Sequence, residues 1–339
     1  MLLIAFGATL ALAPPPRVDL VLDASEARAA LVILRKEEAH QPVTDADWSA
    51  LFATVPYQWL RAREASMGRA FGDDDFRAFL GSAAMIARRP ALEATLDAWT
   101  RADMRALAQQ ALSYLPEGAV IRARVFPEIK PKTNSFVWRH GEDGPAIFLY
   151  LDEHESRDQF ANTVTHECHH IGLQSVEAEQ QRLFAGLTPR VKTTVEWMGG
   201  LGEGEAMLAA AGGPDVHPHA IDDSASRARW DNDMEHFNGD LLALQELFVD
   251  ILDGRLVGDS AIQARAAPFW GYQGAWYTVG YRMSTIVEKR FGRPAVIRGI
   301  VDPRVLLTLY NQAAAEHNAG GGEYLSTWSP DLLKRLLNP

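Results

Sequence analysis

The sequence predicts an α+β protein that is mainly helical. From residue 18 to about residue 115, apolar side chains recur at helical spacing, and Pro and Gly separate the segments. From residue 119 the pattern changes to two short strands, and beyond residue 183 it is mostly helical again. The chain has 339 residues, of which 47% are apolar and 23% are charged. Such a chain can bury a large core, and Cys168, its single cysteine, can form no internal disulfide.

The charge balance limits the classes of partner. The chain has 33 Lys and Arg residues against 44 Asp and Glu residues, which gives a formal net charge of −11. Nucleic-acid binding needs a concentrated basic surface, so we expect no nucleic-acid partner. No stretch reaches the length of about 20 apolar residues that a membrane-spanning helix needs, so we expect no stable membrane insertion of the mature chain.

Residues 1–13 form an uncharged, apolar segment that ends in the small-residue pattern Ala11-x-Ala13. This pattern predicts a possible signal peptide over residues 1–13 and an extracytoplasmic location, either secreted or periplasmic. No basic residue precedes the apolar run, and Pro14 follows the cleavage point. A buried N-terminal helix or strand in a cytoplasmic protein is therefore the alternative interpretation.

Two regions follow the N-terminal segment. Residues 14–115 are predicted to form an N-terminal helical region without the residue spacing of a site. Residues 116–339 begin with two strands, Val120–Phe126 and Ile147–Leu151, with a turn at residues 141–145. Pro127 is expected to end the first strand. We expect a small, largely antiparallel sheet in which the second strand offers an edge to an extended peptide.

A capped helix follows the second strand. Ser156 and Gln159 form the capping-box pattern that starts a helix, and Gly172 is expected to mark its end. One face of this helix is apolar and predicted to pack into the core: Phe160, Val164, Cys168 and Ile171.

The opposite face of this helix carries the strongest chemical signal of the chain, His166-Glu167-x-x-His170. Residues four apart on a helix lie one above the other, so both imidazoles can bind one Zn²⁺ ion. Glu167 lies beside them, where its carboxylate can take a proton from a metal-activated water. The alternative is a solvated helix face with ordinary histidines. His169 is a weaker candidate ligand, and Cys168 is expected to be a small buried hydrophobe.

A catalytic zinc site requires a third protein ligand and an open position. Leu173 and Val176 stand where the metzincin pattern has Gly and His, which excludes that class. Glu203 is the next candidate, because Gly199, Gly200 and Ala206 would let its helix approach the motif helix closely. Glu205 remains an alternative, because it is two positions away and only one of the two carboxylates can face the metal.

The combination of HExxH with Glu203-Gly-x-Ala resembles the gluzincin metallopeptidases, and its second half resembles their aminopeptidase N-like branch. The resemblance implies a zincin-like fold over residues 116–339, with a small sheet over the motif helix and a helical remainder. It also implies one Zn²⁺ per chain, bound by His166, His170 and Glu203. A Tyr-x-x-Gly pattern of that branch matches Tyr277, which implies a tyrosine that stabilises the oxyanion. The whole arrangement is similar to a group of bacterial zinc-dependent peptidases of unknown substrate.

Three departures limit this resemblance. The 32 residues between His170 and Glu203 exceed the spacing in the aminopeptidase N-like branch, and no exopeptidase motif precedes HExxH. Met207 stands where the thermolysin-like branch has a carboxylate. We therefore predict zinc-dependent hydrolysis of a peptide or protein substrate with Glu167 as general base. Aminopeptidase specificity is not implied. The alternatives are a zinc hydrolase of a non-peptide amide or epoxide, a non-catalytic binding protein on a peptidase scaffold, and a helical interaction protein with a coincidental motif.

Overall fold

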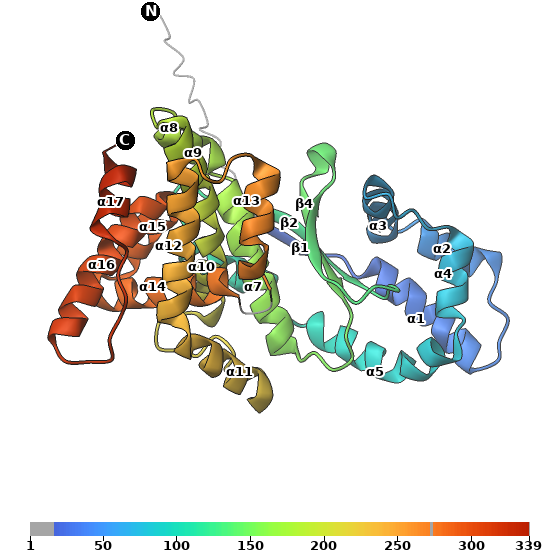
Figure 1. The fold of residues 1–339 in the computed structure, drawn as a ribbon. Helices are drawn as coiled ribbons and strands as arrows, with labels where there is room; N and C mark the ends of the chain where they lie inside the picture. The colour runs from blue at the N-terminus through green and yellow to red at the C-terminus, as the bar shows by residue number, and fades with distance from the viewer. Residues whose placement is uncertain (1–16, 272–273, 339) are drawn as a thin grey trace, which may run out of the picture.

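The computed structural model describes residues 17–271 and 274–338, and it contains a small sheet between two helical lobes (Figure 1). Helices dominate and one four-stranded sheet is present, so the mainly helical α+β class is confirmed. The predicted signal segment, residues 1–13, lies outside the described residues.

The N-terminal lobe begins with a strand that the helical pattern did not predict. β1 (Val18–Leu22) pairs in parallel with β2 (Ile121–Glu128) at the centre of the sheet. The helices of this lobe are α1 (Ser25–Glu38), α2 (Asp45–Phe52), α3 (Val55–Ser66), α4 (Asp73–Leu80) and α5 (Ala83–Trp99), and α6 (Met104–Leu112) leads back to the sheet. The sheet therefore draws a strand from the region that the sequence assigned to helices alone.

The strand order is β1-β2-β4-β3, with β3 (Phe136–Arg139) at one edge and β4 (Pro145–Tyr150) inside the sheet. β1–β2 and β2–β4 are parallel pairs, and only the β3–β4 hairpin is antiparallel. The expectation of a largely antiparallel sheet was wrong, because crossover connections join the other strands and only a hairpin produces antiparallel neighbours. β4 also offers no free edge, since β3 covers it. Pro127 lies inside β2 and does not end it.

The C-terminal lobe is all helical. It contains α7 (Arg157–Gln174), α8 (Glu177–Phe184), α9 (Pro189–Met198), α10 (Gly202–Ala211), α11 (Ser224–Glu235), α12 (Phe237–Asp253), α13 (Asp259–Ala266), α14 (Ala275–Phe291), α15 (Arg293–Val301), α16 (Pro303–Ala319) and α17 (Pro330–Leu337), with single 3₁₀ turns at Gly199–Leu201 and Ala267–Phe269. A third 3₁₀ turn, Gly141–Asp143, joins β3 to β4 in the sheet. No helix in the described part of the chain is both long and apolar enough to cross a membrane.

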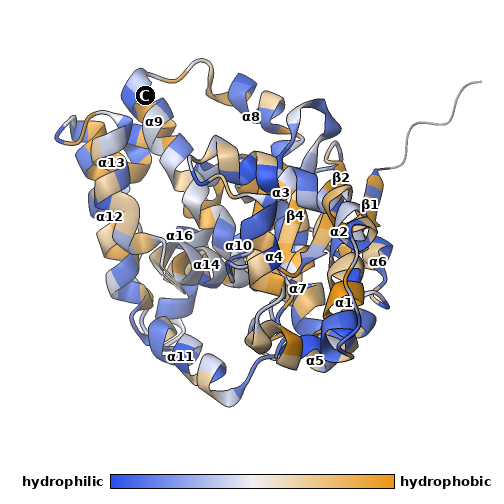
Figure 2. Ribbon diagram, turned by 90° about the vertical axis from the view of Figure 1, so that its right-hand side faces the viewer, coloured by the Kyte–Doolittle hydropathy of each residue, from blue (hydrophilic) through white to orange (hydrophobic). Residues whose placement is uncertain are grey.

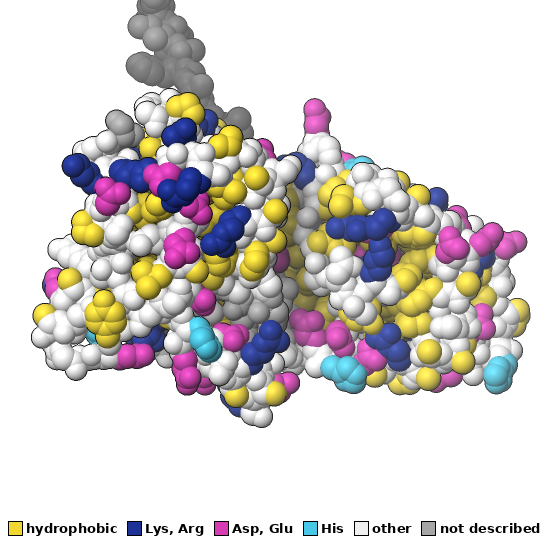
Figure 3. All heavy atoms as spheres, in the orientation of Figure 1, with side chains coloured by type: hydrophobic (Ala, Val, Ile, Leu, Met, Phe, Trp, Pro, Cys, Tyr) yellow, Lys and Arg dark blue, Asp and Glu magenta, His cyan; other side chains and the backbone are white. Residues whose placement is uncertain are grey.

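Two hydrophobic clusters hold the sheet in place. One face of β2 and β4 packs against α1 and α7 as part of the main core. On the other face, Trp59 and Leu60 of α3 cover Phe126 and Phe148. The strands β2 and β4 are consequently mostly buried, while the outer helices mix hydrophilic and hydrophobic residues (Figure 2). A furrow separates the two lobes on the surface (Figure 3).

Candidate metal centre

The helix that carries the HExxH motif is α7, and its start agrees with the sequence prediction. The Ser156 hydroxyl accepts a hydrogen bond from the Gln159 backbone N–H, and the Gln159 side chain accepts one from the Ser156 backbone N–H. Phe160, Val164 and Cys168 are fully buried. Gly172 does not end the helix, which continues to Gln174. A Cβ at Gly172 would lie 2.3 Å from a methyl carbon of Leu115, so the glycine allows close packing instead.

Three side chains from two helices converge at one point. The Nε2 atoms of His166 and His170 are 3.1 Å apart, and Oε2 of Glu203 lies 3.3 Å from each of them. A tetrahedral ion with bonds of about 2.0–2.1 Å places neighbouring ligand atoms about 3.3 Å apart. The donor set of two imidazoles and one carboxylate and its spacing therefore fit Zn²⁺. Among the described residues, this is the one group of three or more potential ligands that lie close enough to share an ion.

Glycines bring the Glu203 helix, α10, into backbone contact with α14. A Cβ on Gly204 would lie 2.0 Å from the backbone nitrogen of Tyr281, and one on Gly280 would lie 2.2 Å from the Leu201 carbonyl oxygen. Gly200 likewise lies against the Trp276 ring. Gly200 was expected to admit the motif helix α7, but the neighbour that it admits is Trp276 of α14. α10 also packs against α7. Nothing lies within 4 Å of a Cβ at Gly199, so its size serves no close contact.

The contact between α10 and α14 places Tyr277 beside the three converging side chains. Burial raises the pKa of the Tyr277 hydroxyl, and the charge of Glu203 and a hydrogen bond with it raise that pKa further. The charge of Glu167 acts in the same direction. Tyr277 is therefore protonated at neutral pH, and its hydroxyl can donate a hydrogen bond to an anion at this centre.

Charge pairing stabilises the ionised form of Glu203. Burial alone would raise the pKa of its carboxyl group, but hydrogen bonds from His166 and His170 and their charges lower it. Burial acts to lower the pKa of His170, and the Glu203 hydrogen bond and charge outweigh burial and raise it. A carboxylate that stays ionised at a depth of this kind is suited to bind a cation.

Glu167 faces an open hollow of about 430 Å³ that it shares with His170 and Glu203. Val137 of the edge strand β3 lines the same hollow. The sequence analysis did not include this strand, although the run Phe136-Val137-Trp138 before a glycine-containing turn is a strand signal. The rest of the lining was also not predicted: Ile171, Leu173, Gln174, Glu177 and Gln180.

The alternative ligands lie elsewhere. Cys168 is fully buried on the opposite face of α7, and burial raises the pKa of its thiol. His169 is also fully buried, and burial together with the neighbouring histidines keeps its pKa well below the ordinary value. Glu205 does not join the group of three, and burial raises its pKa to about 8. The geometry thus favours Glu203 over Glu205 as a ligand.

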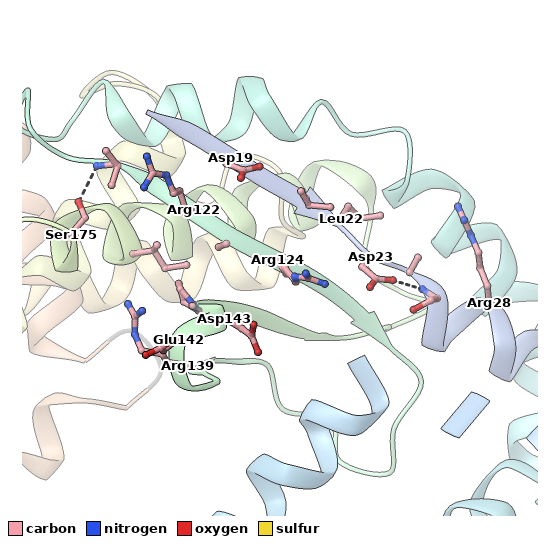
Figure 4. A pocket seen from close by; sticks show the side chains of 18 residues that line it. Asp19, Leu22, Asp23, Arg28, Arg122, Arg124, Arg139, Glu142, Asp143 and Ser175 are labelled. Carbon is pink, nitrogen blue, oxygen red and sulfur yellow. Dashed lines mark hydrogen bonds between the residues drawn. The ribbon is translucent and has the colours of Figure 1, made fainter. Parts of the chain in front are cut away.

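A hollow larger than the one beside Glu167 does not contain these side chains. It measures about 770 Å³ and lies along β1, β2 and the β3–β4 turn (Figure 4). Its wall has balanced charges, with four arginines and four acidic residues: Arg28, Arg122, Arg124, Arg139, Asp19, Asp23, Glu142 and Asp143. Size alone therefore does not identify the functional site here.

The family of this chain agrees with the chemistry of the centre. Residues 48–319 match the family described as "Putative zinc dependent peptidase (DUF5700)". The chain belongs to this family. The match includes His166, Glu167, His170, Glu203 and Tyr277, and the description of the family implies zinc dependence and a hydrolase. No curated protein and no solved structure matches the chain.

Proposed function

We propose that the protein is a zinc-dependent peptidase of the gluzincin type. The observation that carries the proposal is the convergence of His166 Nε2, His170 Nε2 and Glu203 Oε2 within 3.3 Å of one another, beside the hollow that Glu167 lines. These three residues would hold the zinc ion. When bound, zinc would polarise the scissile carbonyl group and make a water molecule a stronger acid.

The remaining chemistry belongs to this chain's own side chains. Glu167 takes a proton from the attacking water and then gives it to the leaving amine, so one carboxylate serves both steps. Tyr277 donates a hydrogen bond to the oxyanion that develops on the scissile carbonyl group. An anionic phenolate could not do this, and the raised pKa of Tyr277 keeps the hydroxyl protonated.

The free edge of β3 supports the proposal that the substrate is a peptide. Among the described strands, β3 pairs only with β4, and its Val137 lines the same hollow as Glu167 and Glu203. An extended peptide can add to such an edge through main-chain hydrogen bonds, which would lay the substrate along the metal centre. The edge is that of β3, in place of the β4 edge expected from the sequence.

The experiment compares Glu167→Gln with wild type on a peptide library. We expect the variant to fold and to retain zinc but to lose roughly 10³-fold in kcat, because Gln cannot accept a proton. Glu179→Gln, an exposed change on the neighbouring helix α8, is the control for loss of a carboxylate. Full activity of Glu167→Gln, or wild-type protein that binds no zinc on titration, would contradict the proposal.

A further inference from the structure

A second hollow adjoins the metal centre and has different walls. It measures about 320 Å³ and shares Leu173, Glu177 and Gln180 with the hollow that contains Glu167 and Glu203. Its inner wall is mostly apolar: Leu173, Phe184, Val195, Met198, Leu201, Ile300 and Pro303. A substrate that reaches Glu167 can therefore place one side chain in this adjoining hollow, which we call the side pocket.

One buried carboxylate faces the side pocket. Glu205 is only 4% exposed and lines no other hollow described here. It lies two residues after Glu203, which turns its side chain about 200° around α10, away from the metal ligands. Its carboxylate makes no hydrogen bond and no ion pair with any residue in the described part of the chain, and neither Lys nor Arg lines the side pocket.

The carboxyl group of Glu205 has no cationic partner within the side pocket, and the one charge that acts on it is that of His170. Buried ionisable groups are ordinarily paired or hydrogen-bonded, because removing an unpaired charge from water is costly. Glu205 with Glu177 and Glu196 does not form a group close enough to hold a metal ion. The apolar walls instead fit the methylene stem of a long side chain whose cationic head would reach the carboxylate.

We propose that Glu205 binds the ammonium or guanidinium group of a lysine or arginine side chain of the substrate. The apolar wall of the side pocket holds the aliphatic stem, and Glu205 selects the charge at its end. The inference rests on the proposed peptidase function and adds a substrate class to it, namely peptides with a basic residue near the scissile bond. A free peptide N-terminus carries the same charge without the stem, so the test keeps all N-termini acetylated.

The test uses quenched fluorescent, N-acetylated peptides that differ at one position only. That position carries Lys, Arg, norleucine or Glu, and it is moved along both sides of the scissile bond. At one position we expect wild-type kcat/KM to be at least tenfold higher for Lys or Arg than for norleucine, which has a similar stem but no charge. Glu205→Gln is expected to bring this ratio close to one. The ratio is informative because a general loss of zinc or of folded protein lowers both rates alike.

Glu196→Gln is the matched control. Glu196 lines the same pocket, but it is exposed at the rim and lies 3.8 Å from Lys192. Its neutralisation should change the Lys-to-norleucine ratio less than about twofold, because exposed charges are screened. An equal loss in both variants would assign the preference to the general negative field and would overturn the role of Glu205.

The outcomes separate this inference from the proposed function. Equal cleavage of the four peptides by wild type, or an unchanged ratio in Glu205→Gln, overturns the side-pocket assignment and leaves the peptidase proposal intact. If zinc-loaded wild type cleaves no peptide, the function fails, and calorimetric titration with N-acetyl-lysine methylamide and its norleucine analogue tests the pocket directly. Preferential, Glu205-dependent binding of the lysine compound then supports the assignment, and equal binding overturns it. If Glu205→Gln does not fold, Glu205→Asp provides the second variant and should lower the ratio in part.

Discussion

Buried carboxylates occur in two regions of the molecule with opposite surroundings. At the metal centre, two histidines donate to Glu203 and lower its pKa. In the N-terminal lobe, Glu26 and Glu128 are fully buried, and one oxygen of Glu26 and both oxygens of Glu128 have no hydrogen-bond partner. Burial raises the pKa of Glu26 to about 8 and that of Glu128 well above its ordinary value. The Glu203 side chain is 20% exposed, so it is less deeply buried than these two acids, and its hydrogen-bond partners also differ from theirs.

This difference shows how burial can be used in two ways. Donors around Glu203 make the ionised form the stable one, so this carboxylate itself has no proton to release before a cation binds. Around Glu26 and Glu128 the charge of Lys130 does not compensate for burial, and the neutral acids are the stable form. The region around Glu203 is suited to bind a cation, and the region around Glu26 and Glu128 makes the stability of the fold depend on pH.

The largest expected effect comes from removing a metal ligand. His170→Ala should lower zinc content from about one ion per chain to none, because two remaining protein ligands do not sustain a catalytic zinc site. Elemental analysis of the purified protein measures this. Glu203→Gln and Glu205→Gln, compared by zinc titration, sharpen the result. Weaker binding in the Glu205 variant alone would reverse the ligand assignment.

A smaller effect is expected at the tyrosine beside Glu203. Tyr277→Phe should lower kcat roughly 10²-fold with little change in KM, as for the loss of one hydrogen bond to the oxyanion. Steady-state kinetics with one peptide substrate measures both constants. A change confined to KM, or no change, would make Tyr277 a packing residue and leave the oxyanion without this donor.

The smallest expected effect concerns the unpaired acids of the N-terminal lobe. Glu26 has a folded-state pKa of about 8 against an ordinary value of 4.5, so between these pH values the folded chain keeps a proton that the unfolded chain releases. Stability therefore falls as pH rises through this window. The same argument applies to Glu128, because burial also raises its pKa well above the ordinary value. Glu128→Gln should raise the free energy of unfolding at pH 8 by about 1–2 kcal/mol and change it little at pH 5, because Gln resembles the protonated acid. Urea unfolding at both pH values tests this expectation.

Glu153→Gln is the control, because it should change the free energy of unfolding at pH 8 in the opposite direction. Arg88 donates hydrogen bonds to Glu153 and lowers its pKa, so its stabilisation is present above the unfolded-state pKa and is lost as pH falls. This variant should be destabilised at pH 8. If Glu128→Gln is also destabilised at pH 8, Glu128 is ionised in the folded protein and the contrast between the two regions does not hold.

Local sequence patterns predicted the part of the candidate site that lies on the single helix α7. The capping box at Ser156 and the spacing of His166 and His170 depend on neighbouring residues only, and the structure has them on one helix. The position of Glu203 relative to the histidines could not be derived from local patterns, because its helix α10 is distant in sequence from α7. The structure places the Glu203 carboxylate beside both histidines. Its metal-binding role stays a prediction, as does the role of Tyr277.

Features that depend on long-range pairing were not predicted. β1 was assigned to a helical region because its five residues are too few to show a period, and its pairing with β2 spans about one hundred residues. The burial of Glu128 was also not visible, since Pro127 was taken as the end of the strand that in fact includes both residues. That the glycines of α10 contact α14 could be seen only in the three-dimensional structure.

The glycine contact has a mechanical consequence. Gly204 and Gly280 let the main chains of α10 and α14 touch, so no flexible side chain lies between them to act as a cushion. The carboxylate of Glu203 and the hydroxyl of Tyr277 are thus mounted on one stiff unit. A bulky polypeptide that enters the hollow beside Glu167 would therefore have to displace its opposite wall, where Val137 of β3 lies, while the distance from Glu203 to Tyr277 stays constant.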